Sequence, residues 1–529
     1  MNEVTCKNNK SKNLLTPVIY LKILIIIVIL TAWFLRVYGL SDKSFRGDEI
    51  HTIIRASYPA SEIISQQKVD ILSEFGGDSE YRLAGSPPLW YLVTSVFIKD
   101  GNIEFWGRLP VAFAGVFCIS LTFLLGKKLF GNNNGLLAAF LLALSPFHIY
   151  YSQDARYIIG LMLLTISNIL IILYIKGHNN VRGWVIFILI TLLNIYNHFF
   201  GFLILGLSGL FFLLPTTISN KKEVVGHSEI HLIIKRNIWQ YAPVLLVSLL
   251  VVLLLYFPQW STLFELFGGV AKTTNIHNFN SSQPDYLKSL MDVGKKITTD
   301  TTIGVIFYGL FFLTGVIQST RRNRNYWTFI ILWWFLPILL FLILNPILVS
   351  PVPAFSLRHL IVVLPVFLVF VAQGMLGSFN WFFISINNFL TNNAWIKLVT
   401  IIIVLTGIIT IQTPALNSYY KNEKQNWRDA VNLIDSSQNP DDIIVVTSPY
   451  RAINYKFYSK QAKEIRIVSE YEKFAELYQQ QPDLCFLRVM SGADIYDRQI
   501  VRFIKQNNFQ VTQFPGIWSG LEVACNREQ

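Results

Sequence analysis

Charged residues and cysteine are both scarce in this sequence. Lys, Arg, Asp and Glu make up 14% of the 529 residues, whereas hydrophobic residues make up 53%. The apolar residues are grouped in long blocks, which excludes an ordinary soluble enzyme and indicates a membrane protein. None of the four cysteines stands in a C-x-x-C spacing, so we do not expect a cysteine-based metal or redox site.

Nucleic-acid binding is not expected either, although the formal net charge is +12. From residue 414 to the end, the chain carries 14 Lys and Arg against 14 Asp and Glu, so the excess lies entirely in the apolar part. Short basic loops in such a part orient a membrane protein. The sequence also contains no RNP-like motif, zinc-finger spacing or basic helix.

Apolar runs and basic loops together predict about eleven transmembrane helices. The first run, 17–39, follows Lys7, Lys10 and Lys12 and has no small-residue cleavage site. We therefore expect an uncleaved span with a cytoplasmic N-terminus in the cell membrane. The other predicted spans cover 108–130, 135–150, 158–175, 184–196, 199–214, 241–257, 303–318, 326–344, 359–376 and 396–412. This count places the C-terminus outside the cell.

The remaining segments predict structure outside the bilayer. Residues 41–107 form a long outer segment, in which 86–97 predicts an apolar helix too short to cross the membrane. In the tail, 414–529, apolar runs at 443–446, 465–468 and 484–487 predict buried strands, with helices near 426–437, 450–459, 470–480 and 494–507. The expected fold is an α-helical polytopic membrane domain over 1–413 and a soluble extracytoplasmic α/β domain over 414–529, with a partly parallel sheet.

Two cysteines, Cys485 and Cys525, lie in this tail. They can pair if the tail is extracytoplasmic. We expect buried free thiols in strands instead, because cysteine is among the most buried residue types.

The ionisable side chains gather on the outer side of this topology, and the spans carry almost no charge. Asp48, Asp154, Arg156, His198 and Arg358 all fall near outer ends of spans. A transporter more often places ionisable residues at mid-depth, so the pattern favours an enzyme or binder at the outer leaflet. A flippase of lipid-linked sugars and a non-catalytic glycan-assembly partner are the alternatives.

The order of several short motifs resembles the family C (GT-C) polytopic membrane glycosyltransferases. Gly-Asp-Glu at 47–49 precedes Ser-Pro-Pro-Leu-Trp-Tyr at 86–91 and Gly-Arg-Leu-Pro at 107–110. Further matching segments lie at 127–131, 145–156, 196–201 and 356–360. The likeness is strongest to the family 39-like branch of protein O-mannosyltransferases and lipid A aminoarabinose transferases. Aminoarabinose transferases have a charged pair where this chain has Gly85 and Ser86, so that sugar specificity does not carry over.

The resemblance implies transfer, with inversion, of a sugar from a polyprenyl-phosphate donor to a hydroxyl acceptor on the extracytoplasmic face. Asp48 matches the acidic residue of the first outer loop, the general base or the group that orients the acceptor. A carboxylate within hydrogen-bond reach can take the proton that the hydroxyl loses. Glu49 matches the second acidic position and either takes part in catalysis or braces the loop. From the residues alone, Asp48 is equally a helix N-cap.

Substrate binding is expected of the other candidates. Asp154 would bind a sugar hydroxyl or, with Asp48, a divalent cation such as Mg²⁺ or Mn²⁺; a salt bridge to Arg156 or a helix cap is the alternative.

Arg358 is the first choice for the lipid phosphate, because guanidinium binds phosphate bidentately, and an interfacial anchor is its alternative. Arg156 and His198 are second choices for the phosphate, with a turn or interface role as the alternative for His198. Tyr157 completes this set.

Overall fold

The structure is a computed structural model of the chain. It describes residues 8–65, 87–98, 101–214, 227–260, 286–347, 357–385, 394–436, 443–461, 463–468, 470–490, 495–507, 509–517 and 519–526. Lys7, Gly85 and Ser86, on which predictions from the sequence rest, fall outside these ranges.

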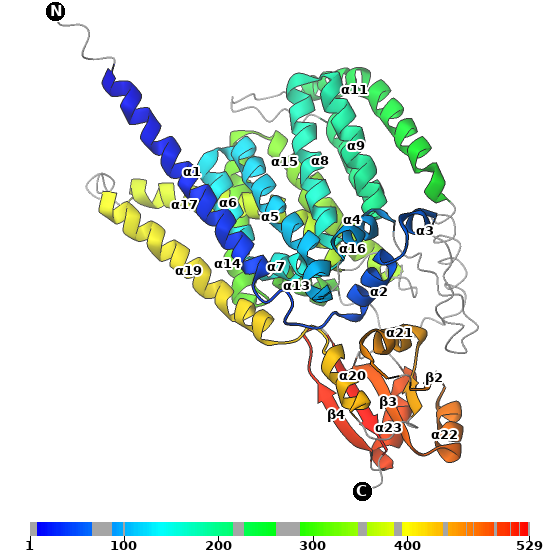
Figure 1. Cartoon of the computed structure of the whole chain (residues 1–529). Helices are drawn as coiled ribbons and strands as arrows, with labels where there is room; N and C mark the ends of the chain where they lie inside the picture. The colour runs from blue at the N-terminus through cyan, green and yellow to red at the C-terminus, as the bar shows by residue number, and fades with distance from the viewer. Residues whose placement is uncertain are drawn as a thin grey trace, which may run out of the picture. The chain divides into compact units, whose positions relative to one another are not determined.

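All eleven predicted apolar segments form helices (Figure 1). They are α1 (Asn8–Val37), α5 (Ile103–Phe130), α6 (Asn132–Leu144) with α7 (Pro146–Ser152), α8 (Ile158–His178), α9 (Val181–Asn197), α10 (Phe200–Leu213), α11 (His227–Tyr256), α14 (Thr302–Arg322), α15 (Asn325–Ile330) with η3 (Ile331–Phe335) and α16 (Leu336–Ile347), η4 (Leu357–Val363) with α17 (Leu364–Ser385), and α19 (Ala394–Lys421). Among the described residues, eight helices are long and apolar enough to cross a membrane, and the bent pair α6–α7 makes a ninth if it is one span. The shorter apolar helices α9 and α10 have 17 and 14 residues. The predicted polytopic helical fold is confirmed.

The remaining short helices are α2 (Gly47–Ala56), α3 (Ala60–Ser65), α4 (Leu89–Phe97), η2 (Phe257–Gln259) and α13 (Tyr286–Ile297). The predicted surface helix is therefore present as α4.

By its internal contacts, the chain divides into two compact units. The first comprises Met1–Tyr38, Val111–Gln153 and Tyr157–Ala415, and the second comprises Gly39–Pro110, Asp154–Arg156 and Leu416–Gln529. The first outer segment thus belongs to the same unit as the tail. The domain boundary expected at residue 413 stays a prediction.

The first unit is a helical bundle with close helix contacts. A Cβ atom at Gly315 would lie 2.0 Å from the carbonyl oxygen of Phe370, so only glycine lets α14 and α17 approach this closely. The bend of 66° between α6 and α7 falls at Pro146, because a residue before proline is pushed out of the helical conformation. Arg36 donates to the carbonyl oxygens of Leu142 and Ala143 in the last turn of α6, next to this break.

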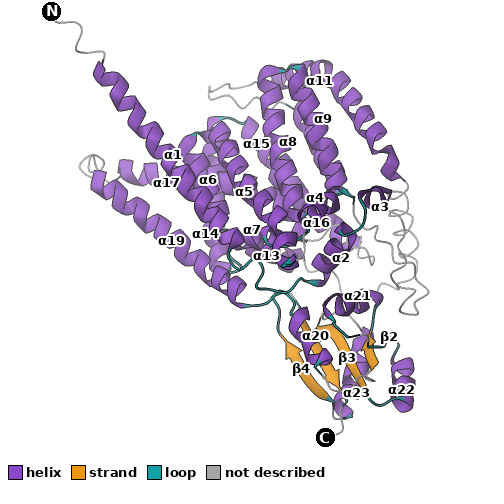
Figure 2. Ribbon diagram, viewed as in Figure 1, coloured by secondary structure: helices purple, strands orange, loops and turns teal. Residues whose placement is uncertain are grey.

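The second unit contains a five-stranded sheet with strand order β2-β1-β3-β5-β4 (Figure 2). The strands are β1 (Ile443–Val446), β2 (Ile465–Ile467), β3 (Leu484–Met490), β4 (Gln510–Phe514) and β5 (Gly520–Cys525). β1 pairs in parallel with β2 and β3, whereas β5 pairs antiparallel with β3 and β4. The partly parallel sheet is confirmed, and β4 and β5 are strands that the sequence analysis did not predict.

Helices cover both faces of this sheet, because alternate side chains of a strand point to opposite sides. On one face, Ile444 and Leu487 pack against α2, α20 (Trp427–Asp435) and α21 (Pro449–Tyr458). On the other face, Val445 and Phe486 pack against α22 (Tyr471–Gln480) and α23 (Ile495–Gln506). The helix that begins at the acidic motif is therefore part of the core of the sheet-containing unit.

The expectation of free thiols in the tail is wrong: Cys485 and Cys525 form a disulfide bond. The two residues lie directly opposite each other in the β3–β5 ladder, with Cα atoms 4.0 Å apart. The sequence pattern predicts no strand at 520–525, so it does not place Cys525 opposite Cys485. The remaining described cysteine, Cys118, is buried and free.

Candidate functional site

The acidic motif forms the first turn of α2. Arg46 is the N-cap, so Asp48 is the second helical residue and Glu49 the third. The alternative that Asp48 caps the helix is therefore wrong. The backbone N–H of Gly47 donates to Gln425 Oε1 at 3.0 Å, and a Cβ atom at Gly47 would lie 2.6 Å from Asn454 Nδ2. The tail thus packs tightly against the start of α2.

Glu49 is fully buried and acts as a brace. Its carboxylate receives two hydrogen bonds from Arg108, at 2.8 and 2.9 Å. It also accepts the backbone N–H groups of Arg46, at 3.0 Å, and Ala155, at 2.8 Å. Burial would raise the pKa of Glu49, but the charges of Arg108 and Lys424 outweigh it and hold that pKa well below its usual value. Glu49 therefore ties the segment at 46 to the segment at 155 as an ionised group.

Asp48, by contrast, is 45% exposed at its side chain. Its Oδ2 accepts a hydrogen bond from Arg156 Nη1 at 2.5 Å and lies 3.2 Å from Arg46 Nη2. Such charge-assisted contacts fix the orientation of a carboxylate. Asp48 is thus an oriented carboxylate that solvent can reach.

Asp154 is fully buried between two cations. Its Oδ2 lies 3.3 Å from Arg46 Nη2, and its Oδ1 lies 3.5 Å from Lys424 Nζ. The sequence alternative paired Asp154 with Arg156, but the Arg156 side chain binds Asp48. The structure therefore brings four predicted residues together, Asp48, Glu49, Asp154 and Arg156.

Three cations of this cluster were given no role by the sequence analysis: Arg46, Arg108 and Lys424. Nearby motifs could have pointed to two of them, because Arg46 comes shortly before the acidic pair and Arg108 lies in the Gly-Arg-Leu-Pro segment. Lys424 had none, because it comes from 270 residues beyond Asp154. Burial lowers the pKa of Lys424 to about 8, although Glu49 and Asp154 favour its charged form.

The other predicted residues lie in the helical unit, where Tyr157 and His198 form a ring stack with His359. The ring centroids of Tyr157 and His198 are 4.5 Å apart, and those of His198 and His359 are 4.6 Å apart. His198 Nδ1 accepts the backbone N–H of Phe200 at 3.1 Å, and Tyr157 Oη lies 3.4 Å from His359 Nε2. Arg358 directly precedes His359 in η4. The structure thus joins Tyr157 and His198, with His359 as a ring that the sequence analysis did not select.

The carboxylates do not suit a divalent cation in this arrangement. Both oxygens of Asp154 face protein cations, and Asp48 Oδ2 is shared by two guanidinium groups. In the described part of the chain, no group of three or more His, Cys, Asp or Glu side chains could hold a metal ion. A divalent cation would meet the positive charges of Arg46, Arg156 and Lys424, so we derive no metal-dependent step.

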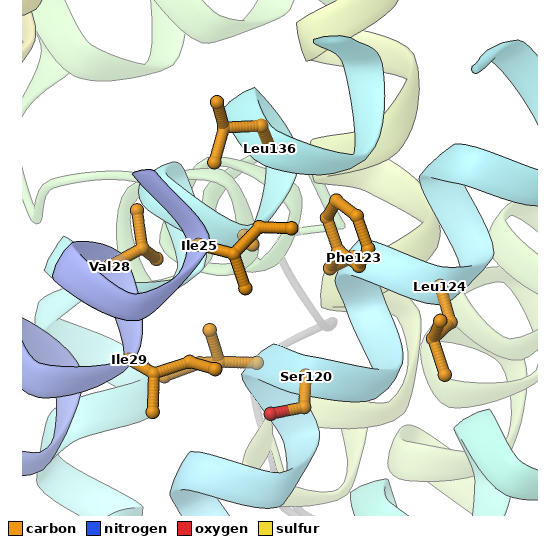
Figure 3. Close-up of a pocket in the computed structure, with 9 residues that line it drawn as sticks. Ile25, Val28, Ile29, Ser120, Phe123, Leu124 and Leu136 are labelled. Atoms are coloured by element: carbon orange, nitrogen blue, oxygen red, sulfur yellow. The ribbon is translucent and has the colours of Figure 1, made fainter. Parts of the chain in front are cut away.

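A separate cavity of about 160 Å³ lies among α1, α5 and α6 of the helical unit (Figure 3). Ile25, Val28, Phe123 and Leu136 are among its lining residues, and its one polar side chain is Ser120, whose hydroxyl donates to the carbonyl of Val116. An apolar lining of this kind offers no group for proton transfer.

The fold is that of the family C (GT-C) glycosyltransferases, as comparison with solved structures shows. ArnT from Cupriavidus metallidurans bound to undecaprenyl phosphate aligns over 96% of this chain and 98% of its own, with 14% identity and a TM-score of 0.50. AglB from Archaeoglobus fulgidus, an archaeal oligosaccharyltransferase, in complex with an inhibitory peptide and a dolichol-phosphate aligns over 88% of this chain and 69% of its own, with 13% identity and a TM-score of 0.51. The same oligosaccharyltransferase in complex with Zn and sulfate aligns over 88% and 67%, with 14% identity and a TM-score of 0.51.

By sequence, no protein-family model and no curated protein matches the chain. At these identities the structural likeness establishes the fold, and the resemblance noted in the motifs is confirmed at that level.

Proposed function

We propose that the protein is a multi-pass membrane glycosyltransferase that moves a sugar from a polyprenyl-phosphate donor to a hydroxyl acceptor. The observation that carries the proposal is the exposed, guanidinium-bound carboxylate of Asp48 within a GT-C fold. The lipid phosphates in the two compared proteins support a donor of the same chemical class.

In the proposed reaction, the acceptor oxygen attacks the anomeric carbon of the sugar. The bond from that carbon to the phosphate oxygen breaks, its electron pair leaves with the lipid phosphate, and the hydroxyl proton passes to Asp48. A single displacement of this kind inverts the anomeric centre. Arg46 and Arg156 hold the carboxylate of Asp48 in place. Glu49 accepts the backbone N–H groups of Arg46 and Ala155 and so holds these two segments together.

The donor site is proposed to include the residues of the helical unit. Arg358 would bind the lipid phosphate, because a guanidinium offers two parallel donors to phosphate oxygens. Tyr157 and His198 would lie beside the sugar, since their stacking with His359 holds the rings in one orientation.

The reaction is proposed to occur on the extracytoplasmic face. Disulfide bonds persist in oxidising compartments, and the Cys485–Cys525 bond lies in the unit that contains Asp48. The basic residues of the N-terminal segment support a cytoplasmic N-terminus.

The test is a reconstituted assay that separates sugar transfer from lipid movement. The full chain in proteoliposomes receives undecaprenyl-phosphate-linked hexoses and aminopentoses, each with a radiolabelled sugar, and heat-inactivated protein is the control. We expect at least one donor to release undecaprenyl phosphate and to pass its label to a water-soluble or lipid hydroxyl acceptor. Movement of intact donor between the leaflets without release would show a flippase instead.

A further inference from the structure

Arg46 occupies a bridging position between Asp48 and Asp154, the two carboxylates that would hold a divalent cation if one is bound. One atom, Arg46 Nη2, lies 3.2 Å from Asp48 Oδ2 and 3.3 Å from Asp154 Oδ2. The Arg46 side chain is only 14% exposed, and that of Asp154 is fully buried. A positive group that contacts two acidic side chains at once fills the role that a bridging divalent cation has in other sites.

Each of the two carboxylates also contacts a second protein cation. Arg156 Nη1 binds Asp48 Oδ2 at 2.5 Å, and Lys424 Nζ lies 3.5 Å from Asp154 Oδ1. Three cations, Arg46, Arg156 and Lys424, therefore contact these two carboxylates, and Lys424 Nζ also lies 3.7 Å from Glu49 Oε2. A divalent cation placed between Asp48 and Asp154 would be repelled by all three.

The backbone holds Arg46 at this position. Arg46 is the N-cap of α2, and its N–H is bound by Glu49 Oε2 at 3.0 Å. Glu49 Oε1 accepts the N–H of Ala155, which places the segment of Asp154 beside that of Asp48. Arg46 is therefore fixed by the same brace that sets the spacing of the two acidic residues.

We propose that Arg46 is a built-in replacement for a divalent cation, so that Asp48 and Asp154 are held and neutralised without metal. Arg46 is then a positioning residue, and the cluster differs in this respect from a site that recruits an ion. The inference goes beyond the proposed function, because it concerns cation binding and can be tested without any donor or acceptor.

The test is Mn²⁺ binding to the full chain in lipid nanodiscs, read from the electron paramagnetic resonance signal of free Mn²⁺. After treatment with EDTA and its removal, wild type is expected to bind no Mn²⁺ that depends on Asp154. Arg46→Gln, which keeps much of the side chain but removes its charge, is expected to gain one Mn²⁺ site, with an affinity at least about 10-fold above any residual binding by wild type, the size of effect that neighbouring groups have on metal affinity. Adding Asp154→Asn to Arg46→Gln should abolish that gain.

Two controls match this variant. Arg428→Gln removes the cation that contacts Glu104, since Arg428 Nη2 lies 2.6 Å from Glu104 Oε1, and it should create no Mn²⁺ site that depends on Asp154. Arg46→Lys keeps the positive charge and should bind no Mn²⁺.

The proposal is overturned if wild type binds one Mn²⁺ that Asp154→Asn abolishes, or if Arg46→Gln gains no binding. If Arg46→Gln does not fold, the wild-type titration against Asp154→Asn decides alone. Failure of the glycosyltransferase assay would leave all these results unchanged, so the two proposals fail independently.

Discussion

The two units of this protein satisfy their buried polar groups in different ways. In the sheet-containing unit, buried charges meet opposite charges: Glu49 binds Arg108, and Asp154 lies between Arg46 and Lys424. In the helical unit, buried polar groups contact rings and backbone groups: His198 stacks on Tyr157 and accepts the N–H of Phe200, and Arg36 donates to the carbonyl of Ala143. Apolar helices tolerate charge poorly. The comparison teaches that the buried carboxylates Glu49 and Asp154 have their charged partners within the unit that is built around the sheet.

The buried pair of Glu49 and Arg108 should show the largest effect on stability. Glu49→Gln leaves Arg108 buried without its charge partner, and breaking such a pair costs about 3–5 kcal/mol of the free energy of unfolding. Thermal unfolding of the protein in detergent measures the loss. Glu472→Gln, at an exposed position of α22, is the matched control and should unfold like wild type.

The same variant has a pH signature. Because the folded-state pKa of Glu49 lies well below its ordinary value of 4.5, its stabilisation is present above pH 4.5 and is lost as the pH falls further. Wild type should therefore lose stability more steeply below pH 4.5 than Glu49→Gln. Parallel acid profiles for the two proteins would show that Glu49 carries no such charge.

The disulfide bond should have the next largest effect. It links cysteines separated by 40 residues, and replacing both Cys485 and Cys525 with Ser is expected to cost about 2–4 kcal/mol. Intact mass after alkylation in denaturant should show two labelled thiols in wild type, Cys6 and Cys118. Four labelled thiols in freshly purified, unreduced protein would contradict the pairing.

A smaller effect is expected in the helical unit. His198→Phe keeps an aromatic ring in the stack but leaves the N–H of Phe200 without its acceptor, at a cost of about 1–3 kcal/mol. His178→Phe changes an exposed ring in the same unit and should leave the melting temperature unchanged. Equal melting temperatures for His198→Phe and His178→Phe would show that the bond from the Phe200 N–H to His198 does not stabilise the helical unit.

The smallest effect is expected from the titration of Lys424, and it should appear as a pH dependence of turnover. Its pKa is lowered to about 8, chiefly by burial, so it loses its charge, and Asp154 loses one cation, as the pH rises through about 8. Turnover should fall over that range. Lys424→Arg should move this limb upward by more than about 1 pH unit, because guanidinium stays charged. Lys43→Arg is the control, because burial also lowers the pKa of Lys43 to about 8. This variant should leave the pH limb where it is in wild type.

Local pattern was enough to predict the apolar helices, the helices of the tail, three of the five strands and the acidic motif at the start of a helix, but not α3 or α13. It failed where pairing between distant segments decides. β5 places Cys525 opposite Cys485, and Lys424 reaches Asp154 across 270 residues. No periodicity in the sequence carries such information.

Local pattern also could not tell which of the two adjacent carboxylates, Asp48 or Glu49, is buried and which is exposed. Successive residues of a helix point about 100° apart, so one carboxylate turns into the core and the other toward solvent. Which of them is exposed depends on where Arg108 and Ala155 lie, and both belong to other segments.

Turnover of Asp48→Asn, measured beside Asp42→Asn, tests the central claim most directly. Asp42 is an exposed residue of the same segment, so the pair differs in position but not in chemistry. The account predicts that kcat falls about 10²- to 10⁴-fold in Asp48→Asn, the usual contribution of a general base, with an unchanged melting temperature and with wild-type turnover in Asp42→Asn. Wild-type kcat in Asp48→Asn would contradict it.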